Sequence, residues 1–123
     1  ICFYFFKEKK IFTGDTLFSL GCGRIFEGTY KQMFDSLLKI KQLPKETEIY
    51  CGHEYTLQNS NFCIANDSKN LRLKEKILEI KKKLKFNLPT IPSILSDEIE
   101  CNIFLKAKDV KSFSKLRDLK DNF

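Results

Sequence analysis

Short apolar runs separated by polar turns open the sequence, a pattern that is typical of β-strands. The apolar run 1–6 is followed by the charged stretch Lys7-Glu8-Lys9-Lys10 and then by the β-formers Ile11 and Phe12. This order predicts two strands joined by a charged hairpin turn, with the second strand leading to Asp15. A chain that opens directly in a strand, without methionine, is expected to be part of a longer protein.

Apolar positions after Thr29 recur at the spacing of an α-helix. Thr29 and Gln32 have the spacing of a capping box, in which the hydroxyl accepts from a backbone N–H and the amide reaches back. The apolar stripe that follows comprises Tyr30, Met33, Phe34, Leu37 and Leu38. Leu43-Pro44 ends this helix, and residues 47–51 predict another short strand. The order strand, helix, strand predicts an α/β layer.

The second half of the chain has a helical and basic pattern. It predicts a short helix with Phe62 turned inward, followed by a longer helix capped by Asp67 or Ser68. On the longer helix, Glu79 and Lys83 have the spacing of a favourable ion pair. Its apolar face is expected to comprise Leu73, Ile77, Ile80 and Leu84.

The last third mixes an extended stretch, an ambiguous segment and one more helix. The prolines in 88–93 predict an extended connector, and residues 97–106 indicate no clear element. Residues 109–119 predict a final helix whose inward side chains are Val110, Phe113 and Leu116. The change of character after residue 55 predicts two domains, an α/β part at 1–55 and a helical part at 56–123.

Composition and charge narrow the function classes only slightly. The chain carries 22 Lys and Arg against 16 Asp and Glu, for a net charge of +6, with much of the excess between Lys69 and Lys85. Such an excess suits a carboxylate-bearing small molecule, nucleic acid or a membrane surface, although a solvated helix face explains the lysine run more simply. The run 1–6 is too short to span a bilayer, and its charges follow it, which does not fit a signal peptide.

Five cysteines stand at scattered positions, without a Cys-x-x-Cys pair. This arrangement predicts neither a zinc knuckle nor a disulfide framework, so we expect reduced thiols in a cytoplasm-like compartment, an organelle remaining an alternative. Cys2 and Cys51 lie in strand-like runs and are interpreted as small core residues.

Candidate chemistry lies at the ends of two predicted strands. Asp15 follows the strand at 11–14, and Gly21-Cys22-Gly23 predicts a second sharp turn because glycine tolerates positive φ and close backbone approach. His53, the one histidine of the sequence, follows the strand at 47–51. A carboxylate and an imidazole suit zinc, iron or manganese, but zinc needs at least three protein ligands. A turn-forming Asp and a structural His are the simpler interpretations of each residue alone.

Longer motifs resemble one family. The string from Phe12 to Phe18, with Gly21-Cys22-Gly23-Arg24 and Phe26-Glu27-Gly28-Thr29, is similar to the glyoxalase II, or hydroxyacylglutathione hydrolase, family. So are Tyr50-Cys51-Gly52-His53-Glu54-Tyr55-Thr56 and the ending Arg117-x-x-Lys120-Asp121-x-Phe123. The resemblance implies a metallo-β-lactamase fold, of the α/β class. This chain would form the second half of its αββα sandwich, followed by a C-terminal α-helical domain.

The resemblance also implies a metal centre. Asp15 matches an aspartate that bridges two divalent metal ions, which would be zinc, iron or manganese. His53 matches the last histidine ligand, and we place it in the substrate-binding set as well. The family's His-x-His-x-Asp-His motif is absent from the sequence. We therefore expect a C-terminal fragment that does not retain the metal ions on its own.

The remaining candidate residues are implied to bind substrate. Arg24 and Tyr55 match positions that contact the glutathione part of the thioester. Arg117 and Lys120 match a pair that holds the glycine carboxylate of glutathione, a role suited to an Arg fork beside an ammonium. Phe26 stands where some members have a tyrosine, so one hydroxyl contact would be missing.

The implied activity is hydrolysis of S-(2-hydroxyacyl)glutathione thioesters, such as S-lactoylglutathione, to glutathione and a 2-hydroxy acid by a metal-bound hydroxide. We expect the isolated chain to be inactive; the alternative is a non-catalytic module that binds glutathione or a protein. A nucleic-acid surface on the lysine-rich helix lacks interleaved exposed aromatics, so we expect neither a nucleic-acid nor a membrane partner. Half of a sandwich would leave Phe3, Phe5 and Phe12 uncovered, which predicts a dimer or a missing N-terminal half as their cover.

Overall fold

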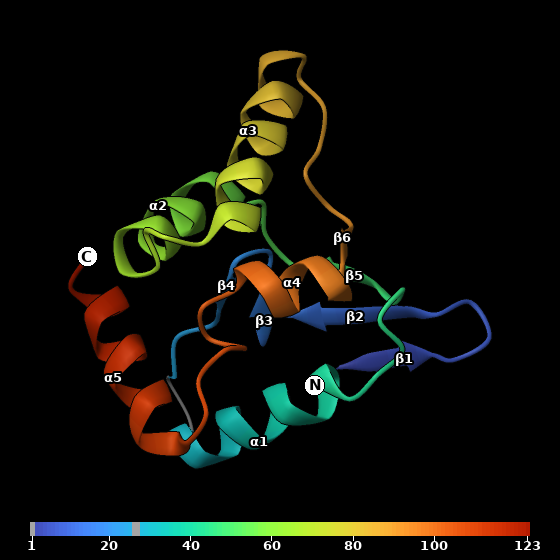
Figure 1. Cartoon of the computed structure of the whole chain (residues 1–123). Coiled ribbons are helices and arrows are strands. Elements are labelled where there is room, and N and C mark those ends of the chain that lie inside the picture. The colour runs from blue at the N-terminus through green and yellow to red at the C-terminus, as the bar shows by residue number, and fades with distance from the viewer. Residues whose placement is uncertain (1, 26–27) are drawn as a thin grey trace.

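A small mixed sheet with helices around it organises the chain (Figure 1). The computed structural model describes residues 2–25 and 28–123. The elements in chain order are β1 (Phe3–Phe5), β2 (Lys10–Gly14), β3 (Leu17–Phe18), β4 (Gly21–Cys22), α1 (Tyr30–Lys41), β5 (Glu48–Cys51), α2 (Thr56–Asn66), α3 (Leu71–Lys85), β6 (Ser93–Ile94), α4 (Leu95–Cys101) and α5 (Val110–Asp121). The chain is therefore a mixed α/β structure, as the sequence predicted.

The main sheet has the strand order β1-β2-β5-β6, and β3 and β4 form a separate hairpin. Strands β1 and β2 pair antiparallel, which confirms the predicted hairpin, and β2 pairs parallel with β5. Helix α1 connects these two parallel strands, so the predicted α/β layer is confirmed. Strand β6 joins β5 from the second half of the chain. Both predicted parts thus contribute to one sheet, and the boundary at residue 55 stays a prediction.

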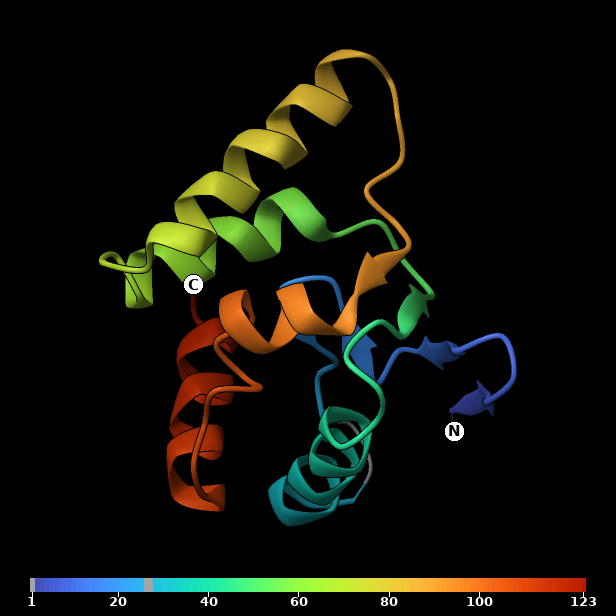
Figure 2. The ribbon, with the colours of Figure 1, turned by 45° about the vertical axis from the view of Figure 1, so that its right-hand side comes forward.

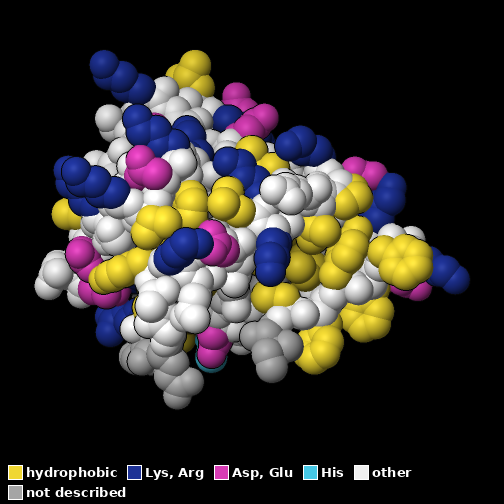
Figure 3. Space-filling view, turned by 90° about the horizontal axis from the view of Figure 1, so that it is seen from below, with side chains coloured by type: hydrophobic (Ala, Val, Ile, Leu, Met, Phe, Trp, Pro, Cys, Tyr) yellow, Lys and Arg dark blue, Asp and Glu magenta, His cyan; other side chains and the backbone are white. Residues whose placement is uncertain are grey.

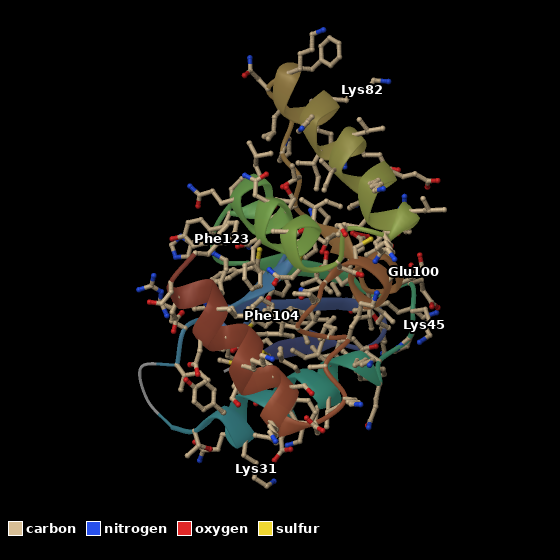
Figure 4. The ribbon with its side chains drawn as sticks, turned by 60° about the vertical axis from the view of Figure 1, so that its left-hand side comes forward. Lys31, Lys45, Lys82, Glu100, Phe104 and Phe123 are labelled. Carbon is tan, nitrogen blue, oxygen red and sulfur yellow. The ribbon has the colours of Figure 1, made fainter. Side chains whose placement is uncertain are left out.

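Four of the helices form two pairs, and α4 lies between the pairs (Figure 1 and Figure 2). Helix α3 lies on the outer side of α2, and α1 lies beside α5 (Figure 2). Phe34 of α1 and Phe113 of α5 pack with ring centroids 5.9 Å apart. Phe104 stacks on Phe62 behind α5 (Figure 4). The core therefore joins side chains from both halves of the chain.

Most predicted helix features are present. The capping box of Thr29 and Gln32 begins α1, and its predicted stripe faces the core. Phe62 on α2 and Phe113 on α5 are buried as expected. The described residues contain no helix that is both long and apolar enough to cross a membrane.

Two predictions about α3 were wrong. Its N-cap is Asn70, whose side chain accepts from the backbone N–H of Leu73 at 3.1 Å, rather than Asp67 or Ser68. The Asp67 carboxylate instead accepts from the Asn70 amide at 2.9 Å, because the helix begins three residues later than a cap at Asp67 requires. The predicted partner of Glu79 was also wrong: its carboxylate lies 3.2 Å from Arg72 and 3.9 Å from Lys76.

One face of the main sheet is open. Side chains on the covered face, including Ile11 and Ile49, are buried, whereas Phe3, Phe5 and Phe12 are 63%, 51% and 43% exposed. The Phe12 ring stacks on Tyr50 at 5.0 Å and meets Phe5 edge-on at 5.7 Å. Seen from below, hydrophobic side chains gather on the side where the β1–β2 hairpin projects (Figure 3). The predicted exposure of these three aromatic residues is confirmed.

All five cysteines are free thiols. The fully buried ones are Cys22, Cys63 and Cys101, whereas Cys2 and Cys51 are only partly buried. Cys2 is partly buried and packs against the core, so the prediction that it is a core residue is confirmed in part. Cys51 lies at the strand end, where its thiol donates to the backbone carbonyl of His53 at 3.2 Å, and it is not a core residue.

Candidate functional site

The two strand tips that carry candidate chemistry meet at one edge of the sheet. Asp15 follows β2 and His53 follows β5, and the carboxyl ends of parallel strands lie side by side. The Gly52 N–H donates to the Gly14 carbonyl at 2.8 Å, which ties the two turns together. His53 Nε2 lies 3.4 Å from Asp15 Oδ1, and both side chains are at least half exposed. The carboxylate and the imidazole therefore share one open site.

This site opens into a cavity of about 520 Å³. Its lining residues come from the strand ends, the β3–β4 hairpin, α2 and α5: Asp15, Phe18, Cys22, Gly23, Arg24, His53, Tyr55, Gln58, Asn59, Arg117 and Lys120. The structure thus brings together every candidate residue from the sequence except Phe26, which lies outside the described residues.

Two glycines at the end of the β3–β4 hairpin allow close packing, Gly23 against Asp15 and Gly21 against Asn59. A Cβ at Gly23 would lie 1.8 Å from the Asp15 carbonyl oxygen, and one at Gly21 would lie 2.6 Å from the amide of Asn59. The predicted turn at Gly21-Cys22-Gly23 was wrong, because residues 21–22 form β4 and the turn lies at Ser19-Leu20, where Leu20 has φ 60°. The predicted close approach of backbone at these glycines is confirmed. The glycines are needed for space rather than for backbone conformation.

An aromatic wall holds the imidazole. The His53 and Tyr55 rings stack with centroids 4.9 Å apart and planes inclined by 8°. Phe18 packs edge-on against both rings, at 6.1 Å from His53 and 5.2 Å from Tyr55. These contacts support one face and one edge of the aromatic cluster around His53 at the cavity wall.

Cys22 contributes no reactive group to the cavity. Its side chain is buried, and this burial raises the pKa of the thiol to about 11, against the opposing effect of the nearby Arg117 cation. The thiol therefore stays protonated near neutral pH and is not an activated nucleophile.

Arg117 is turned toward the protein. It is only 3% exposed, and its Nη1 donates to the backbone carbonyls of Cys22 and Gly23 at 2.6 and 3.2 Å. Its Nε and Nη2 donate to the Asp121 carboxylate at 3.2 and 2.9 Å. The guanidinium also lies over the Phe104 ring, 5.2 Å from its centroid. Arg117 thus fastens α5 to the end of the β3–β4 hairpin.

Lys120 and Arg24 are the accessible cations of the cavity. Burial lowers the pKa of the Lys120 ammonium, and the charges of Arg117 and Arg24 lower it further. Arg24 is 61% exposed along its side chain, and its Nε lies 3.7 Å from Asp121. An anion bound between Lys120 and Arg24 would relieve their mutual repulsion, so this part of the cavity suits a carboxylate.

Asp15 and His53 are the two candidate metal ligands of the site. Among the residues that the structure describes, no group of three His, Cys, Asp or Glu side chains could hold a metal ion. Zinc takes three protein ligands even at open catalytic sites. Asp15 and His53 are suitable donors, but on their own they do not complete a metal centre.

Sequence reasoning missed Gln58 and Asn59, which line the cavity from the first turns of α2. Asn59 is buried, and its amide donates to the Ser19 carbonyl at 3.1 Å. It lies three residues before Phe62, on the same face of the helix. A polar residue on that predicted apolar face was the signal that could have identified it.

Comparisons with known proteins identify the family of this chain. A sequence model described as Hydroxyacylglutathione hydrolase C-terminus matches residues 54–123. Hydroxyacylglutathione hydrolase from Pelagibacter ubique (strain HTCC1062) is 68% identical over 123 residues, which cover 100% of this chain and 52% of the relative. The protein of the same description from Prochlorococcus marinus (strain MIT 9312) is 51% identical over 115 residues, or 94% of this chain and 47% of the relative.

A solved structure shows the fold. The crystal structure of ETHE1 from Myxococcus xanthus, a metallo-β-lactamase fold, superposes with a TM-score of 0.57 at 22% identity, over 90% of this chain and 36% of that one. The chain spans about half the length of the hydroxyacylglutathione hydrolases that it matches. From the match over residues 54–123, together with these relatives, the chain belongs to the hydroxyacylglutathione hydrolase family and corresponds to its C-terminal portion.

Proposed function

We propose that this chain supplies the glutathione-binding half of a hydroxyacylglutathione hydrolase, which converts an S-(2-hydroxyacyl)glutathione thioester to glutathione and a 2-hydroxy acid. One observation carries the proposal. Asp15, His53 and the cations of α5 are far apart in sequence, yet they line one cavity of about 520 Å³. A carboxylate–imidazole pair and accessible cations in the same cavity match the reacting thioester and the carboxylates of glutathione.

The cations have separate roles in this proposal. Lys120 and Arg24 bind a carboxylate of glutathione, because both line the cavity and are not consumed by buried contacts. Arg117 holds the end of the β3–β4 hairpin in the cavity wall, because its nitrogens donate to the carbonyls of Cys22 and Gly23 and to the Asp121 carboxylate. The Tyr55 ring, stacked on His53, contacts the peptide part of the ligand near the reacting end.

Asp15 and His53 are proposed as part of the ligand set of two divalent metal ions, which would be zinc, iron or manganese. The 3.4 Å between their side-chain atoms allows both to approach a common ion. Two donors do not complete such a centre, so we propose that the chain alone does not hydrolyse the thioester. The remaining ligands would come from the half of the relatives that this chain does not cover.

The exposed face of the sheet supports the proposal that a further layer of the fold packs on it. Phe3, Phe5 and Phe12 form an exposed aromatic surface beside Tyr50. We propose that the sheet is the second half of an αββα sandwich, and that the uncovered half of the family protein packs on this face. The free cysteines suit a reducing compartment, so we place the protein in the cytoplasm.

Reconstitution in trans tests the proposal. The chain is co-expressed with the half of the Pelagibacter relative that it does not cover, and S-lactoylglutathione hydrolysis is followed by release of free thiol, with and without added zinc. We expect hydrolysis from the pair and none from either half alone. A pair that associates and binds zinc but releases no thiol would contradict the proposed activity.

A matched pair of lysines on α5 tests the glutathione site. Lys120→Met removes one accessible cation of the cavity, whereas Lys115→Met removes an exposed lysine of the same helix outside the cavity lining. We expect Lys120→Met to weaken glutathione binding about fivefold to tenfold, the usual effect of losing one charged contact. Calorimetric titration of glutathione measures both variants, and Lys115→Met is expected to match the parent.

The two-donor metal site also favours a second candidate function, a module that binds glutathione without turnover. Titration of glutathione with and without zinc separates the two functions when combined with the reconstitution. Zinc-independent binding, together with no thiol release from the reconstituted pair, would support the module.

A further inference from the structure

Two buried polar side chains near the C-terminus of α4 face the β3–β4 hairpin rather than solvent. Glu98 on α4 and Asn102 at its C-cap are both 0% exposed. The Asn102 amide donates to Glu98 Oε1 at 3.0 Å, so the two act together. Glu100 lies between them in sequence, but it is on the outer side of the molecule and its side chain is 60% exposed (Figure 4). A carboxyl group that is buried away from water is costly unless it is well hydrogen-bonded.

Glu98 binds the turn of the hairpin. The Leu20 N–H donates to Glu98 Oε1 at 2.8 Å, and the Ser19 hydroxyl donates to Oε2 at 3.2 Å. Leu20 has φ 60°, a conformation that a leucine rarely adopts. The bond from its amide therefore holds a backbone shape that local sequence does not favour.

Asn102 binds both strands of the hairpin. Its Nδ2 donates to the Gly21 carbonyl at 3.1 Å and to the Phe18 carbonyl at 3.4 Å. Its Oδ1 accepts from the backbone N–H of Phe104 at 3.1 Å, which fixes the side chain itself. The hairpin has only two residue pairs of its own, Leu17 with Cys22 and Phe18 with Gly21. Side chains of α4 thus satisfy backbone groups that a wider sheet would otherwise pair.

The same hairpin forms a wall of the candidate cavity. Phe18 packs against the rings of His53 and Tyr55, and Arg24 follows the hairpin directly. Arg117 binds the carbonyls at the end of the hairpin. A shift of the hairpin would therefore move the aromatic support of the imidazole and an accessible cation at once.

We infer that Glu98 and Asn102 are positioning residues of the cavity: by binding backbone groups of residues 18–21, they set the places of Phe18 and Arg24. This role rests on the proposed function, in which the cavity binds glutathione. Neither side chain lines the cavity, so both act through the hairpin.

Binding by folded variants tests this role. Glutathione affinity is measured by calorimetry for Asn102→Ala, Glu98→Ala and Glu98→Gln, each well below its own unfolding midpoint, with Glu100→Gln as the matched control. We expect the two alanine variants to bind about tenfold more weakly, whereas Glu98→Gln keeps an acceptor for Leu20 and stays within about twofold of the parent. A residue with a purely structural role would lower the unfolding midpoint without changing affinity in the folded state.

A second measurement needs neither ligand nor variant. In the parent chain, the Leu20 amide is expected to exchange its hydrogen about a thousandfold more slowly than in an unstructured peptide. Unprotected exchange there would overturn the inference, as would a folded Asn102→Ala variant with parent affinity and unchanged amide shifts over residues 18–24. If the alanine variants do not fold, a tenfold loss of affinity in Glu98→Gln would overturn it. If the parent does not bind glutathione, the proposed function fails, whereas the exchange and shift data still decide the positioning role.

Discussion

Ionisable residues around the cavity divide into two groups according to where their polar atoms point. Arg117 and Glu98 are buried, and their side chains bind backbone groups of the β3–β4 hairpin. Lys120 and Arg24 are more exposed and line the cavity. Buried charged groups are costly unless fully hydrogen-bonded, so the first group fixes geometry and leaves ligand binding to the second.

The buried Glu98 carboxyl predicts a pH dependence of stability. Burial raises its pKa above the ordinary value of 4.5, so over a range above that pH the folded state holds a proton that the unfolded state has lost. Its contribution to the free energy of unfolding therefore falls as pH rises from 4.5 to the folded-state pKa, and then levels off. Urea unfolding of the parent and of Glu98→Gln over this range isolates the effect, because the contributions of other groups cancel when the two free energies of unfolding are subtracted. The free energy of the parent minus that of the variant is expected to fall as pH rises, and a value that stays constant or rises would contradict the prediction.

The close approach of Gly23 to Asp15 predicts a graded effect of two glycine substitutions. In Gly23→Ala the new Cβ meets the Asp15 carbonyl oxygen at 1.8 Å, so backbone must move, and we expect a loss of about 2–4 kcal/mol. In Gly52→Ala the nearest atoms are Asp15 Oδ1 at 3.1 Å and the Gly14 carbonyl oxygen at 3.2 Å, so a much smaller shift makes room for the new Cβ and the loss is smaller. Urea unfolding measures both. An equal or larger loss in Gly52→Ala would contradict the packing argument.

At the scale of elements, helix starts in this chain depend on residues that the apolar pattern does not identify. Asn70 caps α3, and its amide also donates to the Asp67 carboxylate and the Glu100 carbonyl. The sequence predicted the cap at Asp67 or Ser68, because all of these residue types are good caps and lie within four positions. The contact of Asn70 with α4 favours Asn70 as the cap, and local sequence does not reveal that contact.

Asn70 and Ser68 therefore form a matched test of the α3 start. Asn70→Ala removes the cap of Leu73 and two further hydrogen bonds, so we expect it to lower the free energy of unfolding by about 1–2 kcal/mol. Ser68→Ala alters an exposed side chain and is expected to cost less than about 0.5 kcal/mol. Chemical unfolding compares them. Equal losses would place the cap at the position that the sequence favoured.

The elements that sequence reasoning predicted are those with a continuous pattern. Strands β1, β2 and β5 and helices α1, α2, α3 and α5 follow from apolar periodicity and turn residues. Helix α4 was missed because the buried Glu98 interrupts its apolar stripe and the buried Asn102 follows as its C-cap, and these are the residues that bind the hairpin. The two-residue strand β6 is defined by pairing with β5 alone.

Part of the candidate site was predictable from the pattern of strands, and part only from the family resemblance. Asp15 and His53 follow from strand ends, because parallel strands bring their carboxyl ends together. Lys120 and Arg117 lie on α5, far along the chain from both Asp15 and His53, so only the family resemblance pointed to them. The inward contacts of Arg117 depend on backbone carbonyls of the hairpin, and no sequence pattern encodes those.

At the scale of the whole molecule, one sheet carries helices on one face and bare aromatic side chains on the other. The covered face buries Ile11 and Ile49, whereas the row formed by Phe3, Phe12 and Tyr50 crosses three strands on the opposite face. Exposed apolar surface of this kind drives association in water. Strand β1 is also an edge strand, with unpaired backbone groups on its outer side.

The bare face therefore predicts self-association of this chain in the absence of its proposed partner half. We expect the parent to form dimers or larger species in sedimentation velocity at micromolar concentration, and the double variant Phe5→Ser/Phe12→Ser to shift toward monomer. Stability should change little, because both side chains are substantially exposed. The control is Phe86→Ser/Leu88→Ser, which removes exposed apolar side chains at the end of α3, 61% and 53% exposed, outside the sheet. A parent that stays monomeric, or a control variant that abolishes association, would show that the sheet face is not the surface responsible.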